Sequence, residues 1–155
     1  AMRLQPQARS VCGADSSPAM IAVLQDKIAT LKPGNVSTQR VDFEHGAHAS
    51  GEYDLIVSSM LTHHIPDTAA LLREWKRLLR PRGQIAFADL DTEDGAFHGD
   101  NTGVFHLGFD RAALRQLLLA EGYTDVRDTT ATVVRKEVDG KTREFPIFLI
   151  AARLA

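Results

Sequence analysis

The sequence predicts an α/β domain in which a mostly parallel sheet is covered by helices and ends in an antiparallel hairpin. Short apolar runs alternate along the chain with amphipathic helical segments, the pattern of parallel strands joined by crossover helices. The last two strand-like segments are separated only by Asp139-Gly140, a pair that favours a two-residue hairpin turn. With 155 residues, 44% of them hydrophobic, we expect one domain, residues 1–155, with its own core.

The first third of the chain predicts a strand, a helix and a second strand. Ser10–Ala14 is a short apolar run, and Val36–Phe43 alternates enough to form a half-buried strand. Between them, Ser17 is a suitable N-cap and Pro18 suits the first helical position. Pro33-Gly34 should end this helix.

The middle of the chain predicts two buried strands around a second helix. Leu55–Val57 is fully apolar, which is typical of a strand inside a parallel sheet, and Ile85–Ala88 has the same character. Asp67 can cap the helix between them, and Pro81 should stop it. We expect these strands and the two earlier ones to run in the same direction within one sheet.

The last third predicts a long loop, a helix and the hairpin. Residues 89–108 are rich in glycine and show no period, and loops of this length inside domains are usually functional or mobile. Asp110 can cap a third helix that Gly122 closes. The hairpin strands are Val126–Val138 and Glu144–Ala152, the latter antiparallel to the rest of the sheet.

Composition excludes several classes of partner. A formal net charge of −2 gives no electrostatic footprint for nucleic acid or for an anionic membrane surface. The single cysteine, Cys12, excludes an intrachain disulfide. Without a signal peptide or a long apolar span, we expect a cytoplasmic protein.

Four local patterns, in this order and spacing, carry a family resemblance. They are Gly13-Ala14-Asp15-Ser16-Ser17-Pro18-Ala19-Met20, Tyr53-Asp54-Leu55-Ile56, Leu61-Thr62-His63-His64-Ile65 and Leu78-Leu79-Arg80-Pro81. With them, the chain resembles the class I S-adenosylmethionine-dependent methyltransferases, in their small-molecule branch. The resemblance implies a Rossmann-like, doubly wound sheet and S-adenosyl-L-methionine as cofactor.

The resemblance also implies a missing part. Family members open with a central strand and a glycine-rich loop, and only Ala1 to Arg9 precede the first strand here. We therefore expect an N-terminally incomplete domain that binds the cofactor weakly by itself. Two sheet edges would then lie open; they could pair directly, take a strand from another chain in a homo-oligomer, or belong to a longer protein.

The resemblance assigns the cofactor site residue by residue. Asp15 would accept hydrogen bonds from the ribose hydroxyls, although it could simply stabilise a helix N-terminus. Asp42 would accept from the adenine amino group, or be a loop acid. The remaining implied contacts are Ser16 and Met20 beside the adenine, Phe43 packed on its ring, and Ser58 and Ser59 near the methionine end. The alternatives are that Met20 and Phe43 are core residues and that the two serines only form a turn at a strand end.

His63 and His64 are the candidate catalytic residues. Methyl transfer to a hydroxyl or amine needs proximity and a base, and a neutral imidazole suits that role at pH 7. The resemblance favours the alternative, because in many family members such a pair is structural at a helix entry. The positions of these two histidines, His98 and His106 along the sequence do not have the spacing typical of metal ligands, so we expect no metal site. Asp89 and Asp91 follow the Ile85–Ala88 strand, where such folds face the substrate, but we interpret them as solvated acids of the loop.

The function that these residues favour is transfer of a methyl group from S-adenosyl-L-methionine to a small-molecule acceptor. The alternative is a methyltransferase-like module without catalysis that serves binding or oligomerisation. A nicotinamide-dependent reductase fits less well, because the terminal antiparallel hairpin suits the methyltransferase sheet better.

Overall fold

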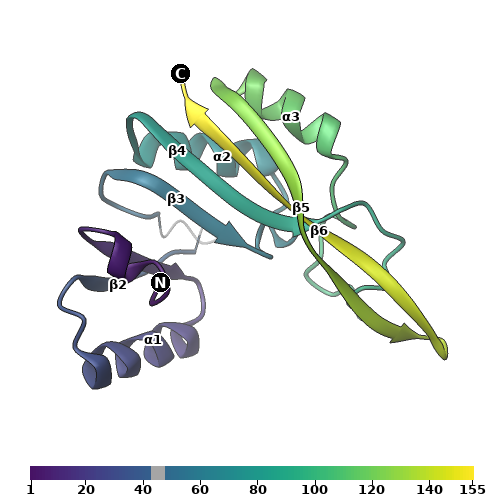
Figure 1. Ribbon diagram of the computed structural model, residues 1–155, viewed down its shortest axis with the longest axis horizontal. Coiled ribbons are helices and arrows are strands. Elements are labelled where there is room, and N and C mark those ends of the chain that lie inside the picture. Colours follow the sequence, from purple (N-terminus) through teal and green to yellow (C-terminus); the bar gives the residue numbers. More distant parts are fainter. Residues whose placement is uncertain (43–47) are drawn as a thin grey trace. The chain divides into compact units, whose positions relative to one another are not determined.

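The computed structural model describes residues 1–42 and 48–155, which form two compact units, Ala1–Gly51 and Glu52–Ala155 (Figure 1). Phe43, one of the predicted cofactor residues, lies outside the described residues. Each unit is described by itself below.

The first unit is a strand–helix–strand motif preceded by a 3-10 turn. Its elements are η1 (Gln5–Gln7), β1 (Val11–Asp15), α1 (Pro18–Leu31) and β2 (Val36–Arg40). The two strands are parallel, with Val11 opposite Val36 and Asp15 opposite Arg40. Ser17 caps α1, because its hydroxyl oxygen accepts a hydrogen bond from the Met20 N–H at 3.3 Å. The predicted start and cap of this helix are therefore confirmed.

The second unit is a four-stranded mixed sheet with helices. Its elements are β3 (Tyr53–Ser59), η3 (Thr62–His64), α2 (Thr68–Leu78), β4 (Leu79–Leu90), α3 (Arg111–Ala120), β5 (Tyr123–Val138) and β6 (Lys141–Leu154). The strand order is β3-β4-β6-β5. β3 and β4 are parallel, whereas β6 is antiparallel to both β4 and β5, so the predicted terminal hairpin is confirmed. Parallel strands, crossover helices and this hairpin confirm the α/β fold class.

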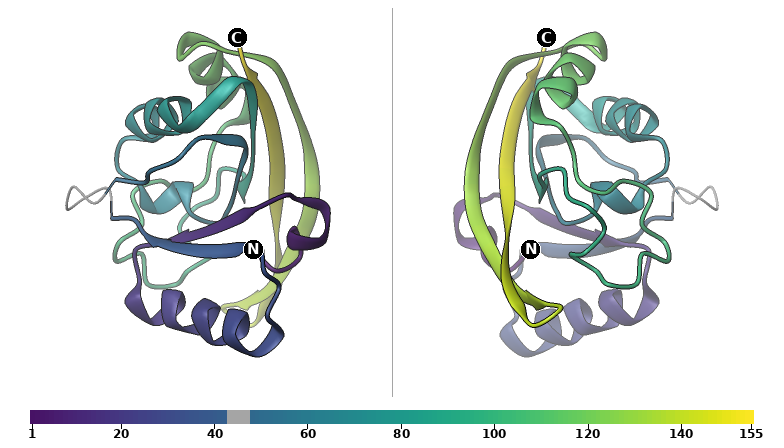
Figure 2. Two further views of the ribbon diagram at one scale, coloured as in Figure 1. Left: turned by 90° about the vertical axis from the view of Figure 1, so that its left-hand side faces the viewer. Right: turned by 90° about the vertical axis from the view of Figure 1, so that its right-hand side faces the viewer.

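The core of the second unit lies between the sheet and its two helices. Figure 2 shows α2 and α3 on the same face of the four-stranded sheet. From α2, Leu72 and Trp75 are buried, and from the strands Phe87 and Phe148 are at most 1% exposed. Tyr123 is also buried, and its hydroxyl donates a 2.7 Å hydrogen bond to the Leu72 carbonyl. This bond joins the start of β5 to α2.

The expectation of one continuous sheet is wrong for the described strands. β1 and β2 pair only in a two-stranded sheet, and β3 begins the separate four-stranded sheet. Consequently β3 is an edge strand, and Leu55 and Val57, predicted to be interior, are 48% and 47% exposed. Apolar runs identify strands, but burial depends on which neighbour pairs with each strand, and that pairing is set over long sequence distances.

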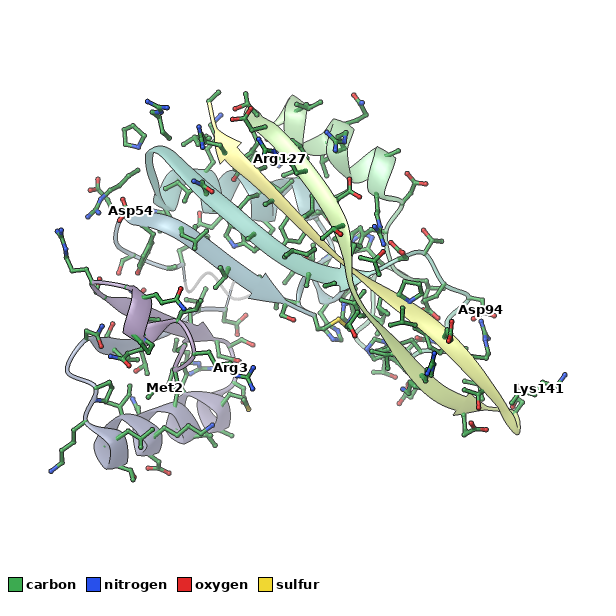
Figure 3. The ribbon with its side chains drawn as sticks, viewed as in Figure 1. Met2, Arg3, Asp54, Asp94, Arg127 and Lys141 are labelled. Carbon is green, nitrogen blue, oxygen red and sulfur yellow. The ribbon has the colours of Figure 1, made fainter. Side chains whose placement is uncertain are left out.

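The long loop after β4 packs against the distal half of the hairpin. Phe97 lies 5.4 Å from Phe145, centroid to centroid, and the Lys136 ammonium lies 4.5 Å from the Phe97 ring centroid. Asp94 and Arg143 form an ion pair at 3.0 Å, and Figure 3 shows Asp94 beside the hairpin whose tip carries Lys141. These contacts hold residues 94–97 against β5 and β6.

Among the residues that the structure describes, no helix combines the length and the apolar composition needed to cross a bilayer.

Candidate functional site

One group of predicted site residues gathers at the carboxyl edge of the first unit's sheet. Asp15 ends β1, and its carbonyl accepts a hydrogen bond from the Val41 N–H at 3.0 Å. Because β1 and β2 are parallel, Asp15, Ser16 and Asp42 all follow strand ends on the same edge. The structure therefore places on one edge three residues that lie up to 27 positions apart in the sequence.

Asp15 serves the start of α1 and retains acceptor capacity. One carboxylate oxygen accepts from the Ser17 N–H at 2.9 Å, as an acid at a helix N-terminus does. A carboxylate offers about four acceptor sites, so this bond does not prevent a second partner. Asp15 can therefore stabilise the N-terminus of α1 and, with the same carboxylate, accept a hydrogen bond from a ribose hydroxyl.

A cavity of about 430 Å³ lies in the same unit, with Asp15 in its wall. Gly13 and Met20 also line it, together with the N-terminal residues Met2 and Arg3, which Figure 3 labels. Met20 is 54% exposed, so it is not a core residue of this unit. A Cβ at Gly13 would lie 2.2 Å from Leu24 Cδ2, so a larger residue there would force the Leu24 side chain to move.

The second group belongs to the carboxyl ends of β3 and β4 in the second unit. Ser58 and Ser59 end β3, opposite Phe87 and Ala88 in the parallel register. The Met60 N–H donates to the Ala88 carbonyl at 2.9 Å, and the chain then enters η3 with its two histidines.

His63 is fully buried against Asp89, which sits near the end of β4. The ring Nδ1–H donates to Asp89 Oδ1 at 2.6 Å, and the His63 backbone N–H donates to Oδ2 at 3.1 Å. Asp89 also accepts from the Leu90 N–H at 2.8 Å, and both side chains have zero exposure. The interpretation of Asp89 as a solvated loop acid is wrong; it orients a histidine.

The Asp89 bond decides the tautomer of His63. With the proton on Nδ1, the neutral ring carries its lone pair on Nε2. That Nε2 is buried and has no hydrogen-bond partner among residues 1–42 and 48–155. Within the described structure, His63 therefore presents an unused acceptor.

Two more imidazoles lie against His63. The ring centroid of His64 is 4.1 Å away and that of His98, from the long loop, is 4.9 Å away. His64 Nδ1–H donates to the Gly103 carbonyl at 2.8 Å. The pKa of His98 is lowered, chiefly by burial and then by the neighbouring His63 and His64. Apart from the unusual length of the loop, nothing in the sequence indicates that His98 lies beside His63 and His64.

His106, by contrast, lies elsewhere. Its Nε2 is 3.0 Å from the Ile65 carbonyl and 3.3 Å from Thr68 Oγ1. It lines a cavity of about 450 Å³ between the start of α2 and α3. The lining of that cavity does not include the three clustered histidines, so the cavity and the cluster are separate features.

Parallel strands with polar residues at their ends and a C-terminal antiparallel hairpin define a Rossmann-like domain, and comparison with known proteins identifies its family. The family model described as "Methyltransferase domain" matches residues 1–87, more than half of the chain. The chain belongs to the class I S-adenosylmethionine-dependent methyltransferases, and S-adenosyl-L-methionine is its family's cofactor.

Curated relatives agree with this family. The chain is 29% identical over 107 residues to an uncharacterized methyltransferase of Schizosaccharomyces pombe, covering 63% of this chain and 37% of that protein. It is 29% identical over 140 residues to the phthiotriol/phenolphthiotriol dimycocerosates methyltransferase of Mycobacterium leprae, covering 90% of this chain and 48% of that protein. The chain thus spans less than half of the length of either relative.

Solved structures share the fold at low sequence identity. The YcgJ protein of Bacillus subtilis superposes with a TM-score of 0.80 at 14% identity, covering 99% of this chain and 86% of that one. Phosphoethanolamine N-methyltransferase 2 of Haemonchus contortus, solved with S-adenosyl-L-methionine, gives 0.74 at 15% identity, covering 94% of this chain and 43% of that one.

Proposed function

We propose that this chain is part of an S-adenosylmethionine-dependent methyltransferase that acts on a small-molecule acceptor. The observation that carries the proposal is the family match over residues 1–87, which includes every predicted site residue and ends just before Asp89. Relatives named for small-molecule substrates support the acceptor class, among them the ubiquinone biosynthesis O-methyltransferase of Aromatoleum aromaticum, 30% identical over 67 residues.

In this proposal, the carboxyl edge of β1 and β2 binds the nucleoside end of the cofactor. Asp15 accepts from the ribose hydroxyls through the acceptor capacity that Ser17 leaves, and Asp42 accepts from the adenine amino group. Ser16 and Met20 border the adenine. Further contacts of the proposed set are Phe43 against the adenine ring, and Ser58 and Ser59 beside the methionine end.

His63 and His64 are the proposed acid–base residues. Methyl transfer is an in-line displacement at a sulfonium, so the protein supplies positioning and accepts the proton of a hydroxyl or amine acceptor. Complete burial leaves His63 Nε2 out of reach of solvent, whereas His64 is only partly buried. We therefore assign proton acceptance to His64 Nε2, with Asp89 and His63 holding the adjacent backbone in place.

The test is calorimetric titration of the chain with S-adenosylhomocysteine, comparing Asp15→Asn with Asp26→Asn. Asp26 is an exposed acid on α1 of the same unit, so it controls for the loss of one charge. We expect Asp15→Asn to weaken binding by about 1–3 kcal/mol, the cost of a lost hydrogen bond to a charged group. Saturable binding that both variants preserve would remove Asp15 from the cofactor site.

The exposed edge of β3 supports a second, structural proposal: pairing with another copy of this chain. An edge strand presents unpaired N–H and C=O groups, and Leu55 and Val57 add apolar area that is half exposed. Val57→Lys should keep the chain monomeric, because a charge on an edge strand disfavours strand addition. Light scattering over a dilution series tests this, and a monomer at every concentration for the unmodified chain would contradict it.

A further inference from the structure

The cluster of His63, His64 and His98 has a property that acid–base catalysis does not require. One ring nitrogen of each residue lies within 4.8 Å of one ring nitrogen of each of the others. The three come from η3 and from the loop after β4, 35 positions apart, so only the folded chain brings them together. All three belong to the second unit.

The hydrogen bonds around the cluster leave several of its ring nitrogens free to accept. Asp89 holds the proton of His63 on Nδ1, and Gly103 holds that of His64 on Nδ1, so each Nε2 carries a lone pair. His63 Nε2 and His98 Nδ1 are buried and have no partner within the described part of the chain. A buried polar atom without a partner costs about 1–3 kcal/mol, and one cation would satisfy both.

The Asp89–His63 pair is also the arrangement that supports metal-binding histidines. A ligating imidazole usually donates its other N–H to a carboxylate or a carbonyl, which fixes the ring and raises the basicity of the ligating nitrogen. His63 has a carboxylate in that position and His64 has a carbonyl. Both supporting bonds are thus already formed.

We propose that His63, His64 and His98 form a binding site for a divalent first-row transition metal of the zinc class. Imidazole nitrogens suit zinc, and three protein ligands leave a fourth tetrahedral position open. Two nitrogens on a tetrahedral zinc lie about 3.4 Å apart at a Zn–N distance of about 2.1 Å. The nitrogens of the cluster, at up to 4.8 Å, need to approach one another by roughly 1.4 Å at most, a movement within the reach of side-chain rotation and of the loop that carries His98.

This inference goes beyond the proposed methyl transfer and does not depend on it. A zinc-bound His64 Nε2 cannot accept a proton, so the proton acceptance proposed for His64 belongs to the chain without zinc. Zinc binding is measured without S-adenosylmethionine, and S-adenosylhomocysteine binding through Asp15 is measured without zinc. A negative result in one titration therefore does not contradict the other proposal.

The experiment is calorimetric titration of the tag-free chain with Zn²⁺, with His98→Gln and His106→Gln as matched variants. His106 is a histidine of the same loop whose ring is engaged at Ile65, so it controls for general loss of an imidazole. We expect one zinc per chain, binding weakened at least about tenfold by His98→Gln and unchanged by His106→Gln. No binding by the unmodified chain, or equal weakening by both variants, would overturn the site.

A second measurement uses the unmodified chain, so its result does not depend on whether a variant folds. Long-range ¹H–¹⁵N spectra report each imidazole nitrogen, and the chain has six histidines. Zinc should shift the ring nitrogens of His63, His64 and His98 and leave the other three in place. Shifts spread over all six, or confined to others, would contradict the proposal.

Discussion

Replacing Asp89 by asparagine tests whether this buried carboxylate organises the site. Asp89 accepts three hydrogen bonds, from the His63 ring, the His63 backbone and Leu90, at 2.6, 3.1 and 2.8 Å. An amide has only one accepting oxygen. If that oxygen keeps the bonds from the His63 ring and from Leu90, the NH₂ group of the asparagine lies against the His63 backbone N–H, and two donors then face each other. That leaves a buried donor unpaired, at about 1–3 kcal/mol, and the two surviving bonds lose about 1 kcal/mol each without the charge.

Burying a neutral amide is easier than burying a carboxylate, which offsets part of this loss. We therefore expect Asp89→Asn to lower the free energy of unfolding by about 2–4 kcal/mol. Urea denaturation followed by tryptophan fluorescence measures it, because Trp75, the single tryptophan, is buried in the same unit.

The control is Asp54→Asn. Asp54 pairs with Arg80 at 3.1 Å, but its side chain is 83% exposed, so its loss should cost less than about 1 kcal/mol. A loss below about 1 kcal/mol for Asp89→Asn as well, at an unchanged denaturant slope, would refute the assignment of three working hydrogen bonds to this carboxylate.

Three smaller changes test other parts of the chain. Arg82 has a φ of +63°, so Arg82→Gly should raise the free energy of unfolding by up to about 1 kcal/mol in urea titration, whereas Arg82→Ala, which keeps the strain, should not. Asp67→Ala removes the N-cap of α2 and should cost about 1 kcal/mol in the same assay; an unchanged midpoint would show that the cap contributes nothing. Burial raises the pKa of Tyr123 above its ordinary value near 10, so the unfolded state ionises first and stability falls as pH rises above about 10. Tyr123→Phe should make that alkaline loss shallower than in the unmodified chain, and an equally steep loss would contradict the burial argument.

Much of the fold is readable from short stretches because the interactions that form it are local. Ser17 before Pro18 predicts the start of α1, since the cap bonds a group three residues away. Asp67 and Asp110 cap α2 and α3 in the same way. Asp139-Gly140 predicts the hairpin because both residues adopt the positive φ that the turn requires, +50° and +73°.

The candidate site was predictable in part, for a related reason. Parallel strands place their carboxyl ends on one edge, so Asp15 and Asp42 could be expected together once the strands were identified. His63-His64 was recognisable as a polar pair after an apolar strand. The sequence contained no signal that Asp89 would be buried rather than solvated, because two of its three donors belong to His63, 26 positions away.

What the sequence determined by itself is each element whose stabilising bond spans a few residues: the caps, the turn and the helical apolar stripes. The tertiary structure alone decided which strands are neighbours, and therefore that Leu55 and Val57 lie on an edge instead of in the interior. It also decided that His98 lies against His63, across 35 positions. Such contacts form when chain segments far apart pack together, and the free energy that selects them is summed over the whole core, so no short stretch of sequence encodes it.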